Sequence, residues 1–260
     1  MPFHLLFSLF TLITTCLSGY SQGKTYAVIV GISDYKALTY RTGDLRFADR
    51  DARQVAAFLR SRPGGNIPVA NLRVLTNAQA TQAAILRAMT VFKNATAADR
   101  VILYFSGHGL ANSFIPYDVL PGQPATMLSH DAVKQAFRRS KAWTKLCIAD
   151  ACLSGTMTQK TPLPTAQAMA ATFSVGTNVA MLLAGRATQL AVEDRRISGG
   201  LFTFFLLKGL AGGADRNANR IVTIRELHAY ISPRVRSATH GRQSPVFYGN
   251  FPDTLALTYL

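Results

Sequence analysis

Charge, and acidic charge above all, is scarce in this sequence. The 260 residues include 13 Asp and Glu against 28 Lys and Arg, which gives a formal net charge of +15. Charged residues make up 16% of the chain and hydrophobic residues 48%, a balance that excludes a disordered chain and predicts a sizeable core. No block of basic residues and no nucleic-acid motif accompanies the charge, so we expect no nucleic-acid partner. We interpret the basic excess as solubility in an anion-rich cell envelope.

Cysteine is equally scarce, with only Cys16, Cys147 and Cys152 in the chain. So few cysteines exclude the disulfide scaffold that small secreted domains use. Cys147 lies within an apolar run and is interpreted as a core residue, whereas Cys152 comes just after that run. We expect no disulfide between these two, because it would consume the one thiol that is placed for chemistry.

The N-terminal part of the chain lacks charge altogether, because residues 1–23 contain no Lys, Arg, Asp or Glu. Residues 5–17 are an apolar stretch that is too short to span a membrane and typical of the centre of a signal peptide. Small residues at 19 and 21 predict a signal peptide over 1–21 and a mature domain over 22–260 without a transmembrane span. We do not expect lipidation of Cys16, because Thr15 precedes it. The sequence therefore predicts an exported protein, located in the periplasm or the cell envelope or secreted from the cell.

What the sequence does contain is an alternation of apolar runs with amphipathic segments. Unbroken apolar runs predict buried strands at 26–31, 72–75, 101–105, 146–149 and 179–183, with a closing edge strand at 245–248. Helices are predicted from 45 with Asp44 as its cap, from 82 with Thr81 as its cap, from 130 with Ser129 as its cap, and over 201–210 and 223–236. Residues 154–176 are rich in small residues and predict a flexible linker. This alternation predicts one three-layer α/β domain with an open, mostly parallel sheet.

Two of the predicted strands end close to a residue type that performs catalysis. Ser106-Gly107-His108-Gly109 follows one strand, and Asp150-Ala151-Cys152 follows the next. The carboxyl ends of parallel strands share one edge of the sheet, so we predict that His108 and Cys152 form a catalytic dyad there. In such a dyad the imidazole takes the thiol proton and later protonates the leaving nitrogen. The backbone N–H groups of Gly109 and Cys152 are the candidate oxyanion hole.

Taken alone, each motif also fits a purely structural role. Ser-Gly-His-Gly can be a turn at a strand end, and Cys152 can be a buried thiol, since cysteine is among the most buried residue types. Their occurrence at two successive strand ends favours the catalytic interpretation.

These residues resemble the caspase-fold cysteine peptidases of the peptidase C14 type, and among them the metacaspase-like bacterial branch. The resemblance covers about residues 26–247. Residues 150–155 are similar to the metacaspase pattern Asp-x-Cys-x-Ser-Gly, and residues 45–52 to the metacaspase stretch that ends in Asp-Ala. Three later segments also resemble bacterial members, namely Gly200-Leu201-Phe202-Thr203, Glu226-Leu227 and Gln243-Ser244-Pro245. The resemblance implies a caspase-like fold, with a mostly parallel six-stranded sheet and helices on both faces.

The same resemblance implies a specificity pocket built from Asp51, Ser106 and Asp150. Two carboxylates at the mouth of a cleft would bind Arg or Lys, and Arg can pair with both. The alternative is structural: Asp51 pairs with a cation on its own helix, and Asp150 caps a loop. The pocket predicts an exported cysteine endopeptidase acting on proteins or peptides with Arg or Lys, not Asp, before the scissile bond. Lys160, the only basic residue between Cys152 and Arg186, is then a candidate site of self-cleavage.

A further motif concerns metal binding. Asp215, Asn217, Asn219 and Glu226 have the oxygen-ligand spacing of a calcium loop. However, Arg220 stands where such a loop needs glycine, and Thr223 with Glu226 forms a capping box that explains Glu226 without metal. We therefore expect that no cofactor is required and name calcium as the ligand that this loop would take.

Two other functions remain open at this point. The chain could be a caspase-fold interaction or regulatory module with little or no proteolytic activity, or another hydrolase that shares the fold without the basic-selective pocket. The presence of both His108 and Cys152 favours the peptidase, because an inactive descendant need not keep either residue.

Overall fold

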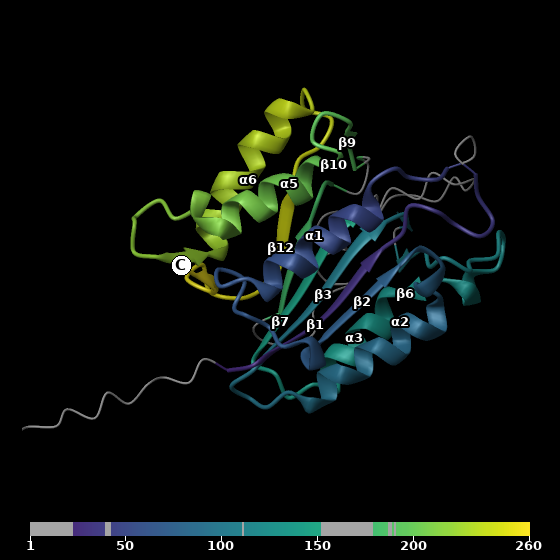
Figure 1. Cartoon of the computed structure of the whole chain (residues 1–260), viewed down its shortest axis with the longest axis horizontal. Coiled ribbons are helices and arrows are strands. Elements are labelled where there is room, and N and C mark those ends of the chain that lie inside the picture. The colour runs from purple at the N-terminus through teal and green to yellow at the C-terminus, as the bar shows by residue number, and fades with distance from the viewer. Residues whose placement is uncertain (1–22, 40–42, 111, 152–178, 187–188, 190) are drawn as a thin grey trace, which may run out of the picture.

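A six-stranded sheet with the order β12-β8-β7-β3-β1-β2 forms the centre of the molecule (Figure 1). The structure is a computed structural model and describes residues 23–39, 43–110, 112–151, 179–186, 189 and 191–260. The strands are β1 (Thr25–Gly31), β2 (Leu72–Thr76), β3 (Arg100–Gly107), β7 (Thr144–Ala151), β8 (Val179–Leu183) and β12 (Val246–Asn250). All pair in parallel except β12, which runs antiparallel to β8 at one edge. The predicted mostly parallel sheet is thus confirmed.

The apolar runs of the sequence are explained by burial on both faces of this sheet. Every residue of β3 and β7 from the third position onward is buried. These two strands also run past the apolar residues, as far as Gly107 and Ala151, and pair with each other there. Their register sets Ser106 beside Asp150, so the predicted site residues meet at the carboxyl edge of the sheet.

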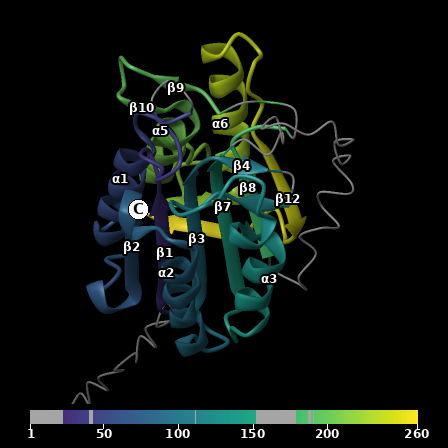
Figure 2. The same cartoon turned by 90° about the vertical axis from the view of Figure 1, so that its right-hand side faces the viewer.

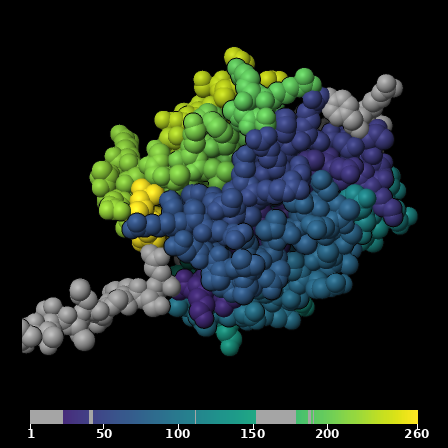
Figure 3. All heavy atoms as spheres, in the orientation of Figure 1, coloured from purple at the N-terminus to yellow at the C-terminus, as the bar shows by residue number. Residues whose placement is uncertain are grey.

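Helices cover both faces and complete the three layers (Figures 1 and 2). One face carries α1 (Ala48–Arg60), α5 (Leu201–Lys208) and α6 (Ile224–Ala238), and the other carries α2 (Gln82–Ala88) and α3 (His130–Arg138). Each set of helices packs on its own apolar core. Figure 3 shows α1, in blue, lying directly against the green C-terminal elements, where α1 contacts α5.

Most predicted helix caps are confirmed, and one is wrong. Thr81, Ser129 and Thr223 each accept a backbone N–H at the start of α2, α3 and α6, and the capping box between Thr223 and Glu226 is present. Asp44, however, caps no helix. Its carboxylate accepts the backbone N–H of Tyr35, and α1 begins three residues later than predicted, at Ala48.

The connecting segments hold short elements that periodicity does not reveal. Residues 109–129 contain a small sheet of β4 (Gly109–Leu110), β5 (Ser113–Phe114) and β6 (Leu128–Ser129). The hairpin of β9 (Glu193–Asp194) and β10 (Gly199–Gly200) leads into α5, and β11 (Ile221–Thr223) pairs with β13 (Ala256–Tyr259). Short 3-10 helices span Val69–Asn71, Asn77–Gln79, Met89–Asn94 and Pro124–Thr126, and a π-helical turn spans Gly209–Gly213.

Several predictions fall on residues outside the described part of the chain. These are the signal peptide over 1–21, the linker over 154–176, Cys152 and Lys160. Among the residues that are described, no helix combines the length and the apolar character needed to cross a bilayer.

Candidate active site

His108 follows β3 directly and is held by residues of the segment between β1 and α1, to which no sequence motif links it. Its ring Nε2 contacts the backbone carbonyl of Gly43. A carbonyl oxygen only accepts hydrogen bonds, so Nε2 has to carry the proton, and Nδ1 keeps a free lone pair. The backbone N–H of His108 donates to the Tyr35 hydroxyl at 2.7 Å, and the two rings lie 5.0 Å apart. The imidazole therefore has a fixed orientation with one nitrogen ready to accept a proton.

The glycine before this histidine has a structural reason. A Cβ at Gly107 would lie 2.7 Å from the Tyr35 hydroxyl and 3.0 Å from the Phe105 ring. Only glycine lets the Tyr35 hydroxyl come close enough to accept the N–H of His108. Gly107 thus helps to orient His108.

The partner of His108 in the predicted dyad lies just beyond the described residues. Ala151, the last residue of β7, pairs with Gly107, the last residue of β3. The residues that follow these two in the chain are Cys152 and His108. The dyad and the oxyanion hole with Gly109 stay predictions, because they depend on Cys152. Cys147, five residues before Cys152, is fully buried inside β7, and burial raises the pKa of its thiol to about 12.

Asp51 and Asp150 come from different elements and converge on one backbone position. Asp51 lies on the buried face of α1 and Asp150 near the end of β7, and their exposed fractions are 2% and 4%. A Cβ added at Gly200 would lie 2.4 Å from one Asp150 oxygen and 3.0 Å from one Asp51 oxygen. The backbone N–H of Gly200 donates to Asp51 at 2.9 Å. Glycine is required here, because any side chain would occupy the space of the two carboxylates.

The hydrogen bonds of this carboxylate pair are incomplete. The Thr203 N–H and hydroxyl donate to Asp150 Oδ2 at 3.2 Å and 2.7 Å. Asp150 Oδ1 is buried and has no hydrogen-bond donor among the described residues. Within the same residues, neither carboxylate forms an ion pair, which counts against the alternative of a helix pair for Asp51.

Both carboxyl groups consequently resist ionisation. Burial, followed by the negative charge of Asp150, raises the pKa of Asp51. Burial also raises the pKa of Asp150, although the hydrogen bonds from Thr203 oppose the shift. Two buried carboxyls without a cation hold a proton that an arriving cation would displace. The arrangement is suited to bind a positively charged group.

Glu193 is a third carboxylate of this site, and the sequence analysis missed it. It accepts the backbone N–H of Phe47 at 2.9 Å and that of Arg46 at 3.0 Å, which fastens β9 to the residues just before α1. Its charge contributes to the raised pKa of both Asp51 and Asp150. Glu193 belongs to no recognised motif, and the separation of 147 residues from Arg46 leaves no local signal that could have revealed it.

The predicted pocket residues line one small cavity together with His108. Asp51, Ser106, Asp150, Glu193 and His108 all border a volume of about 30 Å³. This volume holds roughly two water molecules rather than an arginine side chain. The structure thus brings together His108 and the three predicted pocket residues, around a cavity that has to widen before a large side chain can enter.

The predicted calcium loop uses its oxygens within the protein. Asp215 accepts the backbone N–H groups of Asn219 at 3.2 Å and Arg220 at 2.9 Å, and Asn219 accepts that of Ile221 at 2.9 Å. Glu226 accepts the N–H and hydroxyl of Thr223 as the capping box requires. In the described part of the chain, no group of three or more His, Cys, Asp or Glu could hold a metal ion. Calcium binding by this loop stays a prediction.

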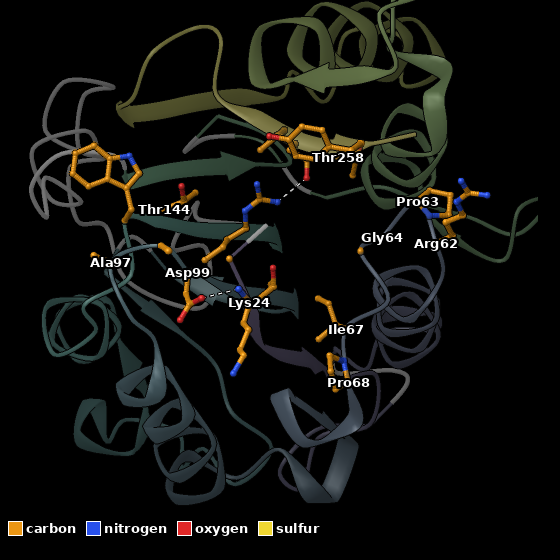
Figure 4. Close-up of a pocket in the computed structure, with 18 residues that line it drawn as sticks. Lys24, Arg62, Pro63, Gly64, Ile67, Pro68, Ala97, Asp99, Thr144 and Thr258 are labelled. Atoms are coloured by element: carbon orange, nitrogen blue, oxygen red, sulfur yellow. Dashed lines mark hydrogen bonds between the residues drawn. The ribbon is translucent and has the colours of Figure 1, made fainter. Parts of the chain in front are cut away.

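A larger cavity, of about 490 Å³, lies at the opposite, amino edge of the sheet (Figure 4). Its lining includes Asp99, whose carboxylate accepts the backbone N–H of Lys24 at 2.6 Å, drawn as a dashed line in Figure 4. The other Asp99 oxygen accepts the N–H and hydroxyl of Thr96. Asp99 is therefore fully engaged, and no predicted catalytic or substrate-binding residue lines this cavity.

Comparison with known proteins supports the assignment of the fold. Solved structures that are similar include a protein from Geobacter sulfurreducens, 19% identical, covering 88% of this chain and 95% of that one with a TM-score of 0.63. Another is caspase-1 from Spodoptera frugiperda, 16% identical, covering 91% of this chain and 90% of that one with a TM-score of 0.61. At these identities the likeness shows the fold alone, and a search of curated proteins found no match. The family model described as the caspase domain of peptidase C14 matches residues 24–256, and the chain therefore belongs to that family.

Proposed function

We propose that this protein is a cysteine endopeptidase of the metacaspase type that cleaves peptide bonds after Arg or Lys. The observation that carries the proposal is the convergence of Asp51 and Asp150 on Gly200, beside His108 and without a cation among the described residues. Membership of the peptidase C14 family supports the reaction class, and the carboxylate pair supports the choice of substrate.

In the proposed reaction, His108 Nδ1 takes the proton of the Cys152 thiol, and the thiolate attacks the scissile carbonyl carbon. The N–H groups of Gly109 and Cys152 would stabilise the negative charge that develops on the carbonyl oxygen. His108 then gives its proton to the leaving nitrogen, and the C–N bond breaks to leave a thioester. Water hydrolyses the thioester, with His108 accepting the proton of the water. The Gly43 carbonyl keeps the imidazole ring oriented during these steps, because it accepts the Nε2 hydrogen throughout.

Recognition of the substrate would occur in the cavity of Asp51, Ser106 and Asp150. A guanidinium group offers paired N–H donors, and Asp150 Oδ1 is a buried acceptor that has no donor in the described part of the chain. Entry of the side chain requires the β9–β10 hairpin to move, because the cavity is only about 30 Å³ and Gly200 of that hairpin lines it beside both carboxylates. The substrate cation would replace the proton that the carboxyl pair holds in the empty pocket.

Hydrolysis of fluorogenic peptides tests the proposal. We expect the mature protein to hydrolyse peptides with Arg or Lys before the reporter group and to leave a matched Asp peptide intact. Cys152→Ala and His108→Ala should remove the activity. Faster turnover of the Asp peptide would overturn the proposed pocket. No turnover of any peptide would favour a caspase-fold interaction or regulatory module instead.

The proposal also covers processing and location, which concern residues outside the described part. If the pocket selects basic residues, self-cleavage after Lys160 follows and should disappear in both Cys152→Ala and Lys160→Gln. A fragment that persists in Cys152→Ala would point to another protease. Export would be shown by a mature N-terminus near residue 22 in protein recovered from the cell envelope or medium.

A further inference from the structure

A basic groove lies at the same carboxyl edge of the sheet, beyond β8. It has a volume of about 830 Å³ and lies between the end of β8, the second half of α6 and the segment that joins α6 to β12. Its lining includes two arginines, two histidines and three serines: Arg186, Arg236, His228, His240, Ser232, Ser237 and Ser244. None of its described lining residues is Asp or Glu. The groove therefore presents positive charge and hydroxyl groups without an internal anion.

The two arginines of this groove are not engaged elsewhere in the described part of the protein. Arg186 and Arg236 form no ion pair and no side-chain hydrogen bond with described residues. Arg234, on the same helix, differs from them. Its guanidinium lies 3.8 Å above the Tyr230 ring and donates to the Tyr230 carbonyl at 3.0 Å, and it does not line the groove. In the second half of α6, one arginine is thus engaged within the protein and the other lines the groove.

The register of the sheet fixes the position of the groove relative to the candidate site. β8 lies between β7 and β12, and Leu183 pairs with Ala149 on one side and Val246 on the other. Arg186 and Val246 therefore lie at the edge of the sheet where Asp150 lies. Neighbouring strands are about 4.8 Å apart, which places β12 about 10 Å from β7. About three residues of extended peptide span that distance.

We propose that this groove binds acidic side chains of the substrate, three or four residues away from the basic residue after which cleavage occurs. The inference rests on the proposed function and narrows its substrate class. The negatively charged pocket would bind the basic residue of the substrate, while the positively charged groove would bind acidic residues that flank it. Segments with only basic residues would satisfy the pocket and be repelled by the groove, so the pair of sites selects segments of mixed charge.

Peptide binding to the full mature chain carrying Cys152→Ala tests this without relying on turnover. One peptide has Arg at the central position and Glu at the third and fourth residues on both sides, and its partner has Gln in place of Glu. We expect the Glu peptide to bind about fivefold more tightly by calorimetry at 0.1 M salt, the size expected of two partly exposed ion pairs. Adding Arg186→Gln or Arg236→Gln should reduce this ratio to about two. Arg234→Gln removes the same charge outside the groove and should leave the ratio unchanged.

Two results would overturn the inference. One is equal binding of the Glu and Gln peptides by the parent protein. The other is an equal loss of selectivity in Arg234→Gln, which would assign the effect to net charge rather than to the groove. Replacing the central Arg by citrulline reports separately on the proposed function. If binding ignores that change but still depends on Glu and Arg186, the pocket assignment fails while the groove stands.

Discussion

Three buried aspartates at opposite edges of the sheet illustrate the difference between a carboxylate that supports the fold and one that is placed to bind a ligand. Asp99, near the amino edge, accepts hydrogen bonds from Lys24 and Thr96 on both oxygens. Burial alone would raise the pKa of Asp99, but these hydrogen bonds lower it below the ordinary value. Asp51 and Asp150, at the carboxyl edge, are likewise inaccessible to solvent but lie deeper in the protein, and their pKa values are raised. Deeper burial, missing hydrogen-bond donors and an adjacent like charge together distinguish this pair from Asp99.

The largest difference between the two edges should appear in catalysis. We expect His108→Ala to lower kcat for an Arg peptide by about a thousandfold, because it removes the group that transfers the proton. Trp143→Ala changes an exposed side chain at the amino-edge cavity and should leave kcat within about twofold. Steady-state kinetics at pH 8 would measure both. A similar loss in Trp143→Ala, or an active His108→Ala, would contradict the assignment of chemistry to the carboxyl edge.

The second difference concerns pH. The pKa of Asp51 is raised to about 8 and that of Asp150 to about 6, with burial as the main cause in each case. Binding of a cation requires the ionised carboxylates, so affinity should fall as protons return. We expect the Kd of an Arg peptide for Cys152→Ala protein to rise about tenfold per unit as pH falls from 8 to 6. Calorimetry across that range would measure it, and a flat profile would show that the carboxyl pair does not contact the peptide cation.

The same comparison predicts opposite effects on stability. A carboxyl whose pKa is raised in the folded protein destabilises the fold increasingly as pH rises above the ordinary pKa, fully so above the raised pKa, and the cost disappears in acid, where the group is protonated in both states. Asp51→Asn removes this charge and should increase the free energy of unfolding at pH 8 by about 1 to 3 kcal/mol. The melting temperature should therefore rise by several degrees. A carboxyl with a lowered pKa stabilises the fold at neutral pH and loses that contribution in acid. Asp99→Asn should therefore lower the melting temperature, by a similar amount.

Thermal unfolding of the two variants beside the parent protein would measure both shifts. If Asp51→Asn melted lower than the parent at pH 8, Asp51 would be a structural carboxylate like Asp99.

The smallest effect is expected from Glu193. Glu193→Gln keeps an oxygen that can accept the N–H groups of Arg46 and Phe47 but removes the charge. The pKa values of Asp51 and Asp150 should then fall, and the binding profile should move to lower pH. At pH 8 the lower pKa values change Kd by at most about twofold, so the lost attraction between Glu193 and the peptide cation should dominate, and we expect about two- to fivefold weaker binding of the Arg peptide. Asp194→Asn is the matched control, because the neighbouring Asp194 pairs with Arg196 at 2.6 Å. An equal effect in Asp194→Asn would assign the change to general surface charge.

The sequence revealed those parts of the molecule that depend on local pattern. Strands β3 and β7 are buried on both faces, so they appear as unbroken apolar runs with His108 and Asp150 near their ends. Asp51 and Ser106 followed from resemblance to a family motif. Thr81 and Ser129 were predictable as helix caps, because each side chain accepts a backbone N–H only three residues later in the sequence.

The parts that the sequence did not reveal depend on contacts between distant segments. Asp44 has a suitable side chain for a helix cap, but the competing N–H of Tyr35 engages it. Glu193 becomes part of the site only when β9 reaches the start of α1, and Gly43 contacts His108 from 65 residues away. The local periodicity of the sequence contains no information about contacts between such distant segments.

The central claim is that Asp51 and Asp150 make a pocket for a positive charge at the carboxyl edge. The most direct test compares kcat/KM for two peptides that differ only in Arg or citrulline before the scissile bond, which are nearly equal in shape but not in charge. We predict at least about a hundredfold preference for Arg, in line with the loss of charge-assisted hydrogen bonds, and a preference reduced to a few-fold in Asp51→Asn. Equal turnover of the Arg and citrulline peptides by the unmodified protein would contradict the account.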